Sequence, residues 1–472
     1  MKDESVGAAE LVHAWAADYL AGLDERPVRA PGADEAAARF TGPLPEEGDG
    51  ALAAVQELLE EGLDAAIASA GPRCFHFVTG GVTPAALGAD WLASTLDQNG
   101  FAWIESPLSG RLEVLSVDWL KELFRLPAEW GGVLTTGATM ANFTALAAAR
   151  QWWGERHERD SAADGLAGLP AVPVLSSGYI HPSARKALAM LGIGREGVRT
   201  FSRDSVGRLD LDALTDALRS LGGAPAIVVA NAGEVNAGDF DPIAALADVA
   251  AEHGAWLHVD GAFGLFARVS PRVAALADGV ERADSVIADG HKWLNVPYDC
   301  GFAFVRDQAL LAKVFSFSAA YLPDPDDPHP NFGTVGPEAS RRARSLAVWA
   351  TLRAYGRAGY RELVEHHLDL AQHLAAAVDA APDLERLAEV PLNIVCFRFR
   401  PPGLSEEELD DLNARLGEEV LADGRVYVGT TRYGGRIAFR PAIVNWRTRP
   451  EDVELLADVI RELGAVLLAR TN

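Results

Sequence analysis

Residues 284–295 read DSVIADGHKWLN, and this stretch decides the fold class of the chain. Its first half is an apolar run that is typical of a buried strand. Its second half is a short turn that presents Lys292. A lysine at the end of a buried strand loses hydration, which favours a neutral amine able to form a Schiff base. A solvated surface position is the commoner explanation for an isolated lysine, so the assignment depends on a second motif.

That second motif lies upstream, where residues 255–264 read AWLHVDGAFG. An apolar run ends there in Asp260 and is followed by small residues. Pyridoxal phosphate needs a lysine for its aldehyde and a carboxylate that keeps its ring nitrogen protonated, so that the ring accepts electrons when a bond at Cα breaks. Asp260 and Lys292 each follow a strand, and open α/β sheets bind ligands at the carboxyl ends of their strands. The two motifs together predict a pyridoxal phosphate site.

Further short apolar runs alternate with helical patterns through the middle of the chain, at residues 132–135, 171–175, 226–230 and 302–305. This alternation predicts an α/β fold with a mainly parallel central sheet covered by helices.

The chain divides into three predicted regions. Residues 1–70 form a helical segment with too little apolar surface for its own core, which we expect to pack on a partner subunit. Residues 71–345 form the large cofactor-binding domain. A long helix is predicted to begin near Ala339, and residues 346–472 mix strands with helices and form a smaller α+β domain.

Composition excludes several classes of protein. The 472 residues carry a formal net charge of −25, which argues against nucleic acid or an anionic membrane as a partner. Cys74, Cys300 and Cys396 are sparse and show no metal-ligand spacing, so we expect reduced thiols, no metal and a cytoplasmic protein. The first residues lack a signal-peptide pattern, and no apolar run is long enough to span a bilayer.

Two more motifs complete a candidate cofactor site. Residues 135–142 read TTGATMAN, follow a strand and open a helix that we predict to begin at Asn142. The N–H groups of Ala138 and Thr139, with the Thr139 hydroxyl, suit a phosphate, although a purely structural turn has the same pattern. His181 follows the strand at 172–175, where an imidazole either stacks on the cofactor ring or merely caps the next helix.

The order of these motifs resembles the group II pyridoxal-phosphate-dependent decarboxylases, the family of aromatic-amino-acid and glutamate decarboxylases. The resemblance covers nearly the whole chain. It rests on the motifs already quoted, of which His291-Lys292-Trp293 is the most specific, and on residues 76–79, 101–107 and 341–346. It implies the aspartate-aminotransferase-like fold, fold type I, and a homodimer that acts on an amino acid.

The resemblance also assigns roles to individual residues. Lys292 is similar to the Schiff-base lysine, Asp260 to the carboxylate facing the ring nitrogen, Ala262 to the residue under the ring and His181 to the residue stacked over it. Residues expected near the phosphate or substrate are Gly137, Ala138, Thr139, Asp289 and His291. Residues expected on the substrate side, drawn from both subunits, are Thr79, Phe77, Phe101 and Trp103.

The loop before Arg341 departs from the family pattern. Relatives carry there a tyrosine that protonates Cα after CO2 leaves, whereas residues 323–337 contain none. An ungapped count back from Arg341 puts Phe332 at that place, and phenylalanine cannot donate a proton. In relatives, such a change accompanies capture of the carbanion by oxygen, which yields an aldehyde, ammonia and peroxide. Tyr321 and His329 are nearby alternative acids.

Residues 232–236 depart as well, since Glu234 and Asn236 stand where relatives usually have threonines. They either approach the cofactor or substrate or serve only as loop polar groups. We therefore expect α-decarboxylation of an L-amino acid, with an aromatic or apolar side chain suggested by the expected pocket wall. The alternatives are an aldehyde synthase, a transaminase or a carbon–carbon bond-forming enzyme with the same cofactor, and a cofactor-binding protein without turnover.

Overall fold

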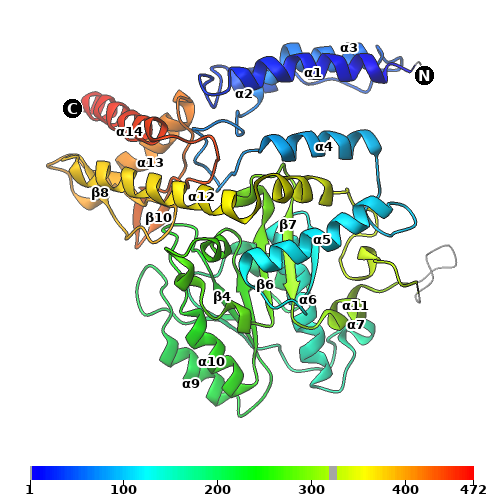
Figure 1. The fold of residues 1–472 in the computed structure, drawn as a ribbon. Coiled ribbons are helices and arrows are strands. Elements are labelled where there is room, and N and C mark those ends of the chain that lie inside the picture. Colours follow the sequence, from blue (N-terminus) through cyan, green and yellow to red (C-terminus); the bar gives the residue numbers. More distant parts are fainter. Residues whose placement is uncertain (1–2, 318–326, 472) are drawn as a thin grey trace.

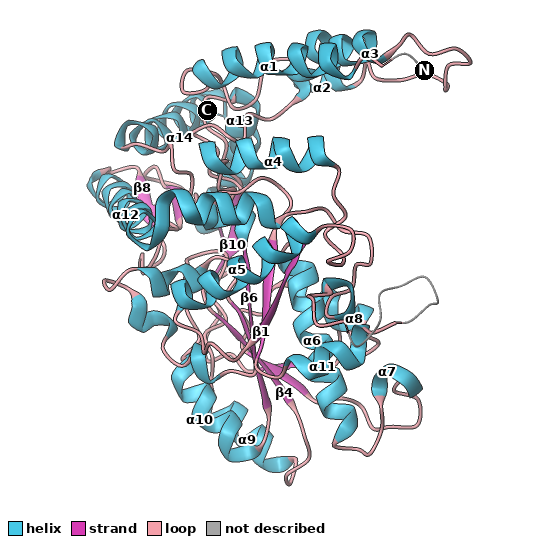
Figure 2. Ribbon diagram, turned by 45° about the vertical axis from the view of Figure 1, so that its right-hand side comes forward, coloured by secondary structure: helices cyan, strands magenta, loops and turns pink. Residues whose placement is uncertain are grey.

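The computed structural model describes residues 3–317 and 327–471 and is organised around a seven-stranded sheet (Figures 1 and 2). Its strand order is β1-β7-β6-β5-β4-β2-β3. The strands are β1 (Gly131–Thr135), β2 (Val174–Ser176), β3 (Val198–Thr200), β4 (Ile227–Asn231), β5 (Trp256–Asp260), β6 (Ser285–Asp289) and β7 (Gly301–Val305). The strands from β3 to β6 run parallel, and β7 is antiparallel to β1 and β6. The mainly parallel sheet is therefore confirmed.

Helices cover both faces of this sheet, and its central strands are therefore buried along their whole length. One face packs on α6 and the other on α10. The helices of this region are α4 (Pro84–Leu96), α5 (Pro107–Phe124), α6 (Ala138–Glu155), α7 (Ser161–Asp164), α8 (Pro182–Met190), α9 (Leu211–Ser220), α10 (Ile243–His253) and α11 (Gln308–Phe315). Its short 3-10 and π-helical turns are η3 (Gly264–Val269), η4 (Ala274–Ala277), η5 (Val280–Arg282), η6 (Gly290–Leu294) and η7 (Phe332–Thr334).

The C-terminal part forms a second, smaller layer. A four-stranded antiparallel sheet, in the order β10-β11-β9-β8, packs against three helices. Its elements are α12 (Ser345–Ala380), β8 (Leu384–Arg386), β9 (Phe397–Phe399), α13 (Glu406–Asp423), β10 (Thr430–Tyr433), β11 (Arg436–Phe439) and α14 (Pro450–Thr471). This agrees with the predicted α+β character of the C-terminal residues, whereas the exact domain boundaries stay a prediction.

Two predicted helix starts were wrong. The helix expected from Asn142 begins at Ala138, because Gly137, with φ of 123°, turns the chain directly into the helix. The helix expected from Ala339 begins at Ser345, because the backbone before it pairs with another segment. The carbonyl of Arg341 accepts from the N–H of Gly100, and Arg342 forms a β-bridge with Asn99.

The N-terminal helices lie along one end of the molecule, away from the large sheet (Figures 1 and 2). They are α1 (Ser5–Ala21), α2 (Ala33–Ala37) and α3 (Ala51–Glu57), followed by η1 (Leu58–Gly62) and η2 (Leu63–Ala65). Several large apolar side chains of this N-terminal segment, including Leu44 and Leu58, remain exposed. Their packing on a partner subunit stays a prediction. None of the helices in the described part of the chain has the length and apolarity needed to cross a bilayer.

Candidate active site

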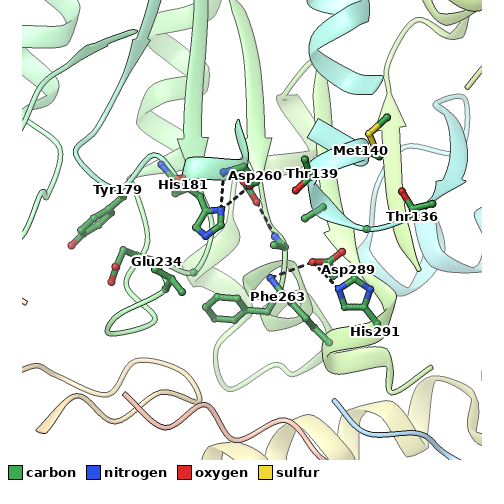
Figure 3. A pocket seen from close by; sticks show the side chains of 18 residues that line it. Thr136, Thr139, Met140, Tyr179, His181, Glu234, Asp260, Phe263, Asp289 and His291 are labelled. Atoms are coloured by element: carbon green, nitrogen blue, oxygen red, sulfur yellow. Dashed lines mark hydrogen bonds and ion pairs between the residues drawn. The ribbon is translucent and has the colours of Figure 1, made fainter. Parts of the chain in front are cut away.

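One pocket of about 260 Å³ opens at the carboxyl ends of β4, β5 and β6 (Figure 3). Alternate residues of a strand share a face, so Asp260 and Asp289 both end on the α6 face of the sheet. The pocket contains all nine residues predicted to bind the cofactor, which are Gly137, Ala138, Thr139, His181, Asp260, Ala262, Asp289, His291 and Lys292. Residues up to 155 positions apart in sequence are thus brought together.

Lys292 projects into this pocket from η6, directly after β6. Its Nζ lies 3.2 Å from Asp289 Oδ2 and 5.8 Å from the centre of the Phe263 ring. The next residue, Trp293, is fully buried and donates from Nε1 to His367 Nδ1 at 2.8 Å. This buried indole anchors the turn, so the amine is presented from a fixed backbone.

Asp260 ends β5 with both carboxylate oxygens engaged. Oδ2 accepts a hydrogen bond from Asn142 Nδ2 at 2.9 Å, and Oδ1 accepts from the N–H of Ala262 at 3.2 Å. Each oxygen keeps a further lone pair that can accept another hydrogen bond. The arrangement suits an anion that faces a protonated ring nitrogen.

The N-terminus of α6 forms an anion cradle on another wall of the pocket. The first N–H groups of a helix have no intrahelical partner, and Gly137 has no side chain to cap them. A Cβ at Gly137 would lie 2.8 Å from His291 Cε1, so only glycine permits this close approach. Asp289 Oδ1 is buried without a partner among the described residues. Unpaired donors, an unpaired acceptor and the adjacent Lys292 fit the polar groups of pyridoxal phosphate.

The hydrogen bonds of both pocket histidines define which ring nitrogen carries the proton. His181 caps α8 and accepts at Nδ1 from the N–H of Ser183 at 3.2 Å, so its proton lies on Nε2. His291 accepts at Nδ1 from the N–H of Cys300 at 3.2 Å and stacks on Tyr298 with ring centres 4.3 Å apart. Desolvation lowers the pKa of both histidines and outweighs the opposing effect of the nearby carboxylates, so both rings are neutral near pH 7.

Glu234 lines the pocket, but its carboxylate also closes its own turn. Oε1 accepts from the N–H and side-chain amide of Asn236, and Oε2 accepts from the N–H of Ala237 at 2.9 Å. Burial raises the pKa of Glu234 despite these donors. Asn236 in turn accepts from the Thr431 hydroxyl at 2.6 Å. The local role predicted as the alternative is thus present, and Glu234 also faces the cofactor side.

The predicted substrate and loop residues do not line this pocket within one chain; they are Thr79, Phe77, Phe101, Trp103, His329 and Phe332. Four of them form a separate cluster. Trp103 stacks on His329 with ring centres 4.7 Å apart, and the carbonyl of Phe101 accepts from the N–H of Phe332 at 2.9 Å.

Phe332 lies in the core rather than in an open loop. Its side chain is 6% exposed and packs among apolar residues, with the Arg341 guanidinium 5.4 Å from its ring centre. His329 is exposed and bonds Asp327 Oδ1 through Nδ1 at 2.6 Å. Tyr321, the other alternative acid, lies outside the described residues.

Sequence reasoning missed several residues of the pocket wall, among them Tyr179, Ser183 and Asn231, and the Asp260 partner Asn142. Tyr179 donates to Asp239 Oδ2 at 2.7 Å, and desolvation followed by that carboxylate raises its pKa. Asn142 had a detectable signal, because it is a polar amide near the start of an alanine-rich helix that packs on the sheet. Such an amide requires a buried polar partner.

The two sheets and the Lys292 pocket define a pyridoxal-phosphate-dependent enzyme of fold type I. The pyridoxal-dependent decarboxylase conserved domain matches residues 44–400, and the chain therefore belongs to this family of carboxy-lyases.

Two relatives and one solved structure illustrate the similarity. The aromatic-L-amino-acid decarboxylase of Bacillus atrophaeus is 32% identical over 83% of this chain and 81% of its own. The L-2,4-diaminobutyrate decarboxylase of Rhizobium meliloti (strain 1021) is 32% identical over 90% of this chain and 84% of its own. The crystal structure of Oryza sativa TDC with PLP and tryptamine superposes with a TM-score of 0.89 at 27% identity, covering 99% of both chains. Plant aldehyde synthases also occur among the relatives.

Proposed function

We propose that this enzyme removes the α-carboxylate of an L-amino acid as CO2 in the Lys292 pocket, with an amine as the product. One observation carries the proposal: Lys292, Asp260 and the N-terminus of α6 converge on a single pocket. They correspond to the aldehyde, the ring nitrogen and the phosphate of the cofactor. The bound cofactor withdraws the electrons of the bond between Cα and the carboxylate as that bond breaks.

Each residue then has a defined task. Lys292 would hold the cofactor covalently through Nζ, and Asp289 Oδ2, 3.2 Å from that amine, orients it. Asp260 would accept a hydrogen bond from the ring nitrogen, while the N–H groups of Ala138 and Thr139 would bind the phosphate. His181, neutral with its proton on Nε2, would stack on the cofactor ring and could offer that N–H to the substrate.

The final step requires an acid that returns a proton to Cα. Phe332 has no such proton, and its side chain is packed in the core of its own chain. This burial argues against Phe332 at the place of the family tyrosine and weakens the case for the diverted reaction. We assign the acid to Tyr321 or His329, which both carry a transferable proton. Aldehyde formation stays the second candidate because aldehyde synthases are among the relatives.

We propose an aromatic or apolar side chain for the substrate. Phe77, Phe101 and Trp103 would form the wall that receives it, contributed by a partner subunit in a homodimer. Aromatic-amino-acid decarboxylases among the relatives support this choice, and the diaminobutyrate decarboxylases are its main competitors. We place the enzyme in the cytoplasm, where its three buried cysteines remain reduced.

Product analysis tests the reaction. Purified holoenzyme would be given a panel of L-amino acids while CO2, amine, aldehyde and peroxide are measured. We expect equal amounts of CO2 and amine with the best substrate. Lys292→Ala should show no activity and should lack the absorbance of cofactor bound to the lysine. Peroxide in equal amount to CO2 would show that the reaction is an oxidative one.

Three substitutions locate the acid. If Tyr321 is the donor, Tyr321→Phe diverts product from amine to aldehyde, whereas His329→Gln leaves the amine fraction unchanged. The reverse result assigns the acid to His329. Phe332→Tyr is the matched control, and we expect no change in product ratio because that side chain lies in the core. A higher amine fraction in Phe332→Tyr would return Phe332 to the active site.

A further inference from the structure

Three alternate residues of β5 point to the same face of the sheet. Trp256, His258 and Asp260 are two positions apart, and all three are buried under α6. On the neighbouring strand, Ser285 stands in register with His258. A continuous polar path therefore runs along β5, from its first residue to the Asp260 carboxylate, through the otherwise apolar layer between sheet and helix.

The direction of the path follows from its two ends, because the Trp256 indole N–H can only donate and the Asp260 carboxylate can only accept. Trp256 Nε1 donates to Ser285 Oγ at 3.0 Å. The Ser285 hydroxyl has His258 Nδ1, at 2.9 Å, as its one acceptor among the described residues, so it donates there. His258 Nδ1 is then an acceptor, and its proton lies on Nε2.

The direction continues to the carboxylate. His258 Nε2 donates to Asn142 Oδ1 at 2.8 Å, which fixes the oxygen of that amide toward His258. The Nδ2 group of Asn142 consequently faces Asp260 Oδ2 at 2.9 Å. Ser183 Oγ, 3.4 Å from Nδ2, is its second contact. Complete burial also lowers the pKa of His258 to about 4, which keeps the ring neutral with one proton to donate.

We propose that His258 and Asn142 are positioning residues. The N–H at His258 Nε2 fixes the orientation of the Asn142 amide, so that its Nδ2 donor, and not its oxygen, faces Asp260. With a donor at each oxygen, Asp260 remains a hydrogen-bond acceptor for the ring nitrogen of the cofactor. Loss of the His258 N–H frees the amide to turn its oxygen toward Asp260, where two acceptors repel. This inference rests on the proposed role of Asp260 and adds the chain that enforces it.

Affinity for the cofactor tests the chain without any need for turnover. The cofactor would be removed, and binding of pyridoxal phosphate to each apoprotein measured by quenching of tryptophan fluorescence. We expect His258→Leu to weaken binding by about 10- to 100-fold, as is usual when a supporting hydrogen-bond partner is removed. His258→Gln, whose amide both accepts and donates, should recover most of that loss.

A double-mutant cycle separates this role from general destabilisation. In an Asn142→Ala background the chain is already cut, so His258→Leu should change the affinity by less than about threefold. Equal losses in the two backgrounds would contradict a chain through Asn142, as would unchanged binding by His258→Leu in the wild-type background. Asn142→Asp, which turns an acceptor toward Asp260, gives an independent check should His258→Leu fail to fold. It must bind more weakly than Asn142→Ala.

The control for the proposed function is the wild-type apoprotein. Its failure to bind pyridoxal phosphate would refute the site assignment as a whole. Normal wild-type binding together with intact binding in the His258 and Asn142 variants would refute only the chain.

Discussion

Gly80 packs so closely against the turn that carries Lys292 that no side chain fits at this position. Its N–H donates to the His291 carbonyl at 3.2 Å, and a Cβ added there would lie 1.6 Å from the Lys292 carbonyl oxygen. Backbone cannot move aside as a flexible side chain can. We expect Gly80→Ala to displace the Lys292 turn, to lower the free energy of unfolding by about 3 kcal/mol and to abolish cofactor absorbance.

Gly88 in α4 provides the matched control, because nothing lies within 4 Å of the Cβ that it would gain. Gly88→Ala should raise the free energy of unfolding by about 0.5–1 kcal/mol, since alanine is the better helix former. Urea unfolding and the visible spectrum would be recorded for both variants. Similar behaviour of the two would show that the turn around Lys292 is not sterically locked.

Side-chain chemistry explains which site residues could be predicted. Lys292 and Asp260 were found because a lysine and a carboxylate after apolar strands are informative in themselves. The roles of Asn142 and His258 were not predicted, because the role of an amide or an imidazole depends on the direction of the neighbouring hydrogen bonds. Phe332 was assigned by counting through a loop, and a count along the chain carries no information on burial.

The strand β1 depends on one buried ion pair for its position. Arg341 makes two bonds of 2.9 Å to the Glu113 carboxylate, and both side chains are almost fully buried. The pair also bonds both backbone groups of Leu134. The Leu134 N–H donates to Glu113 at 3.0 Å, and the Leu134 carbonyl accepts from Arg341 at 2.6 Å. The turn proposed to bind the phosphate follows directly, so this ion pair positions it.

Removing one partner of a buried pair leaves the other charge uncompensated. We expect Arg341→Met to lower the free energy of unfolding by about 3–5 kcal/mol and to weaken cofactor binding. The adjacent Arg342 pairs with Asp90 at the surface, so Arg342→Met should cost no more than about 1 kcal/mol. Urea unfolding of both variants checks this. Equal losses of unfolding free energy would contradict a special role for the Glu113–Arg341 pair.

Elements were predicted best where the period of apolar residues is unambiguous. The apolar runs ending in Asp260 and Asp289 became β5 and β6 with both faces buried. Helix starts were harder, because a start depends on tertiary bonds. Arg341 and Arg342 are good helix formers, yet their backbone pairs with residues 99–100 and delays α12.

The whole chain carries two groups of predicted site residues that do not meet. Lys292, Asp260 and His181 share one pocket, whereas Phe101, Trp103 and His329 cluster elsewhere. Apolar side chains near this second group are uncovered, with Ile104 74% exposed. A contact with a partner subunit would cover this apolar surface. A symmetric dimer would unite the second group of one subunit with the pocket of the other.

Mixing inactive variants tests this arrangement. Lys292→Ala lacks the lysine, and Trp103→Ala should lose most activity because its substrate wall is gone. If sites are shared, a dimer with one subunit of each kind has one intact site and one doubly defective site. Random pairing makes about half of all dimers mixed, so activity should recover to about a quarter of wild type. Lys292→Ala mixed with Asp260→Ala is the control, since both changes fall in the pocket of a single chain and no intact site can form. Recovery in the control but not in the Trp103 mixture would reverse the assignment of residues to subunits.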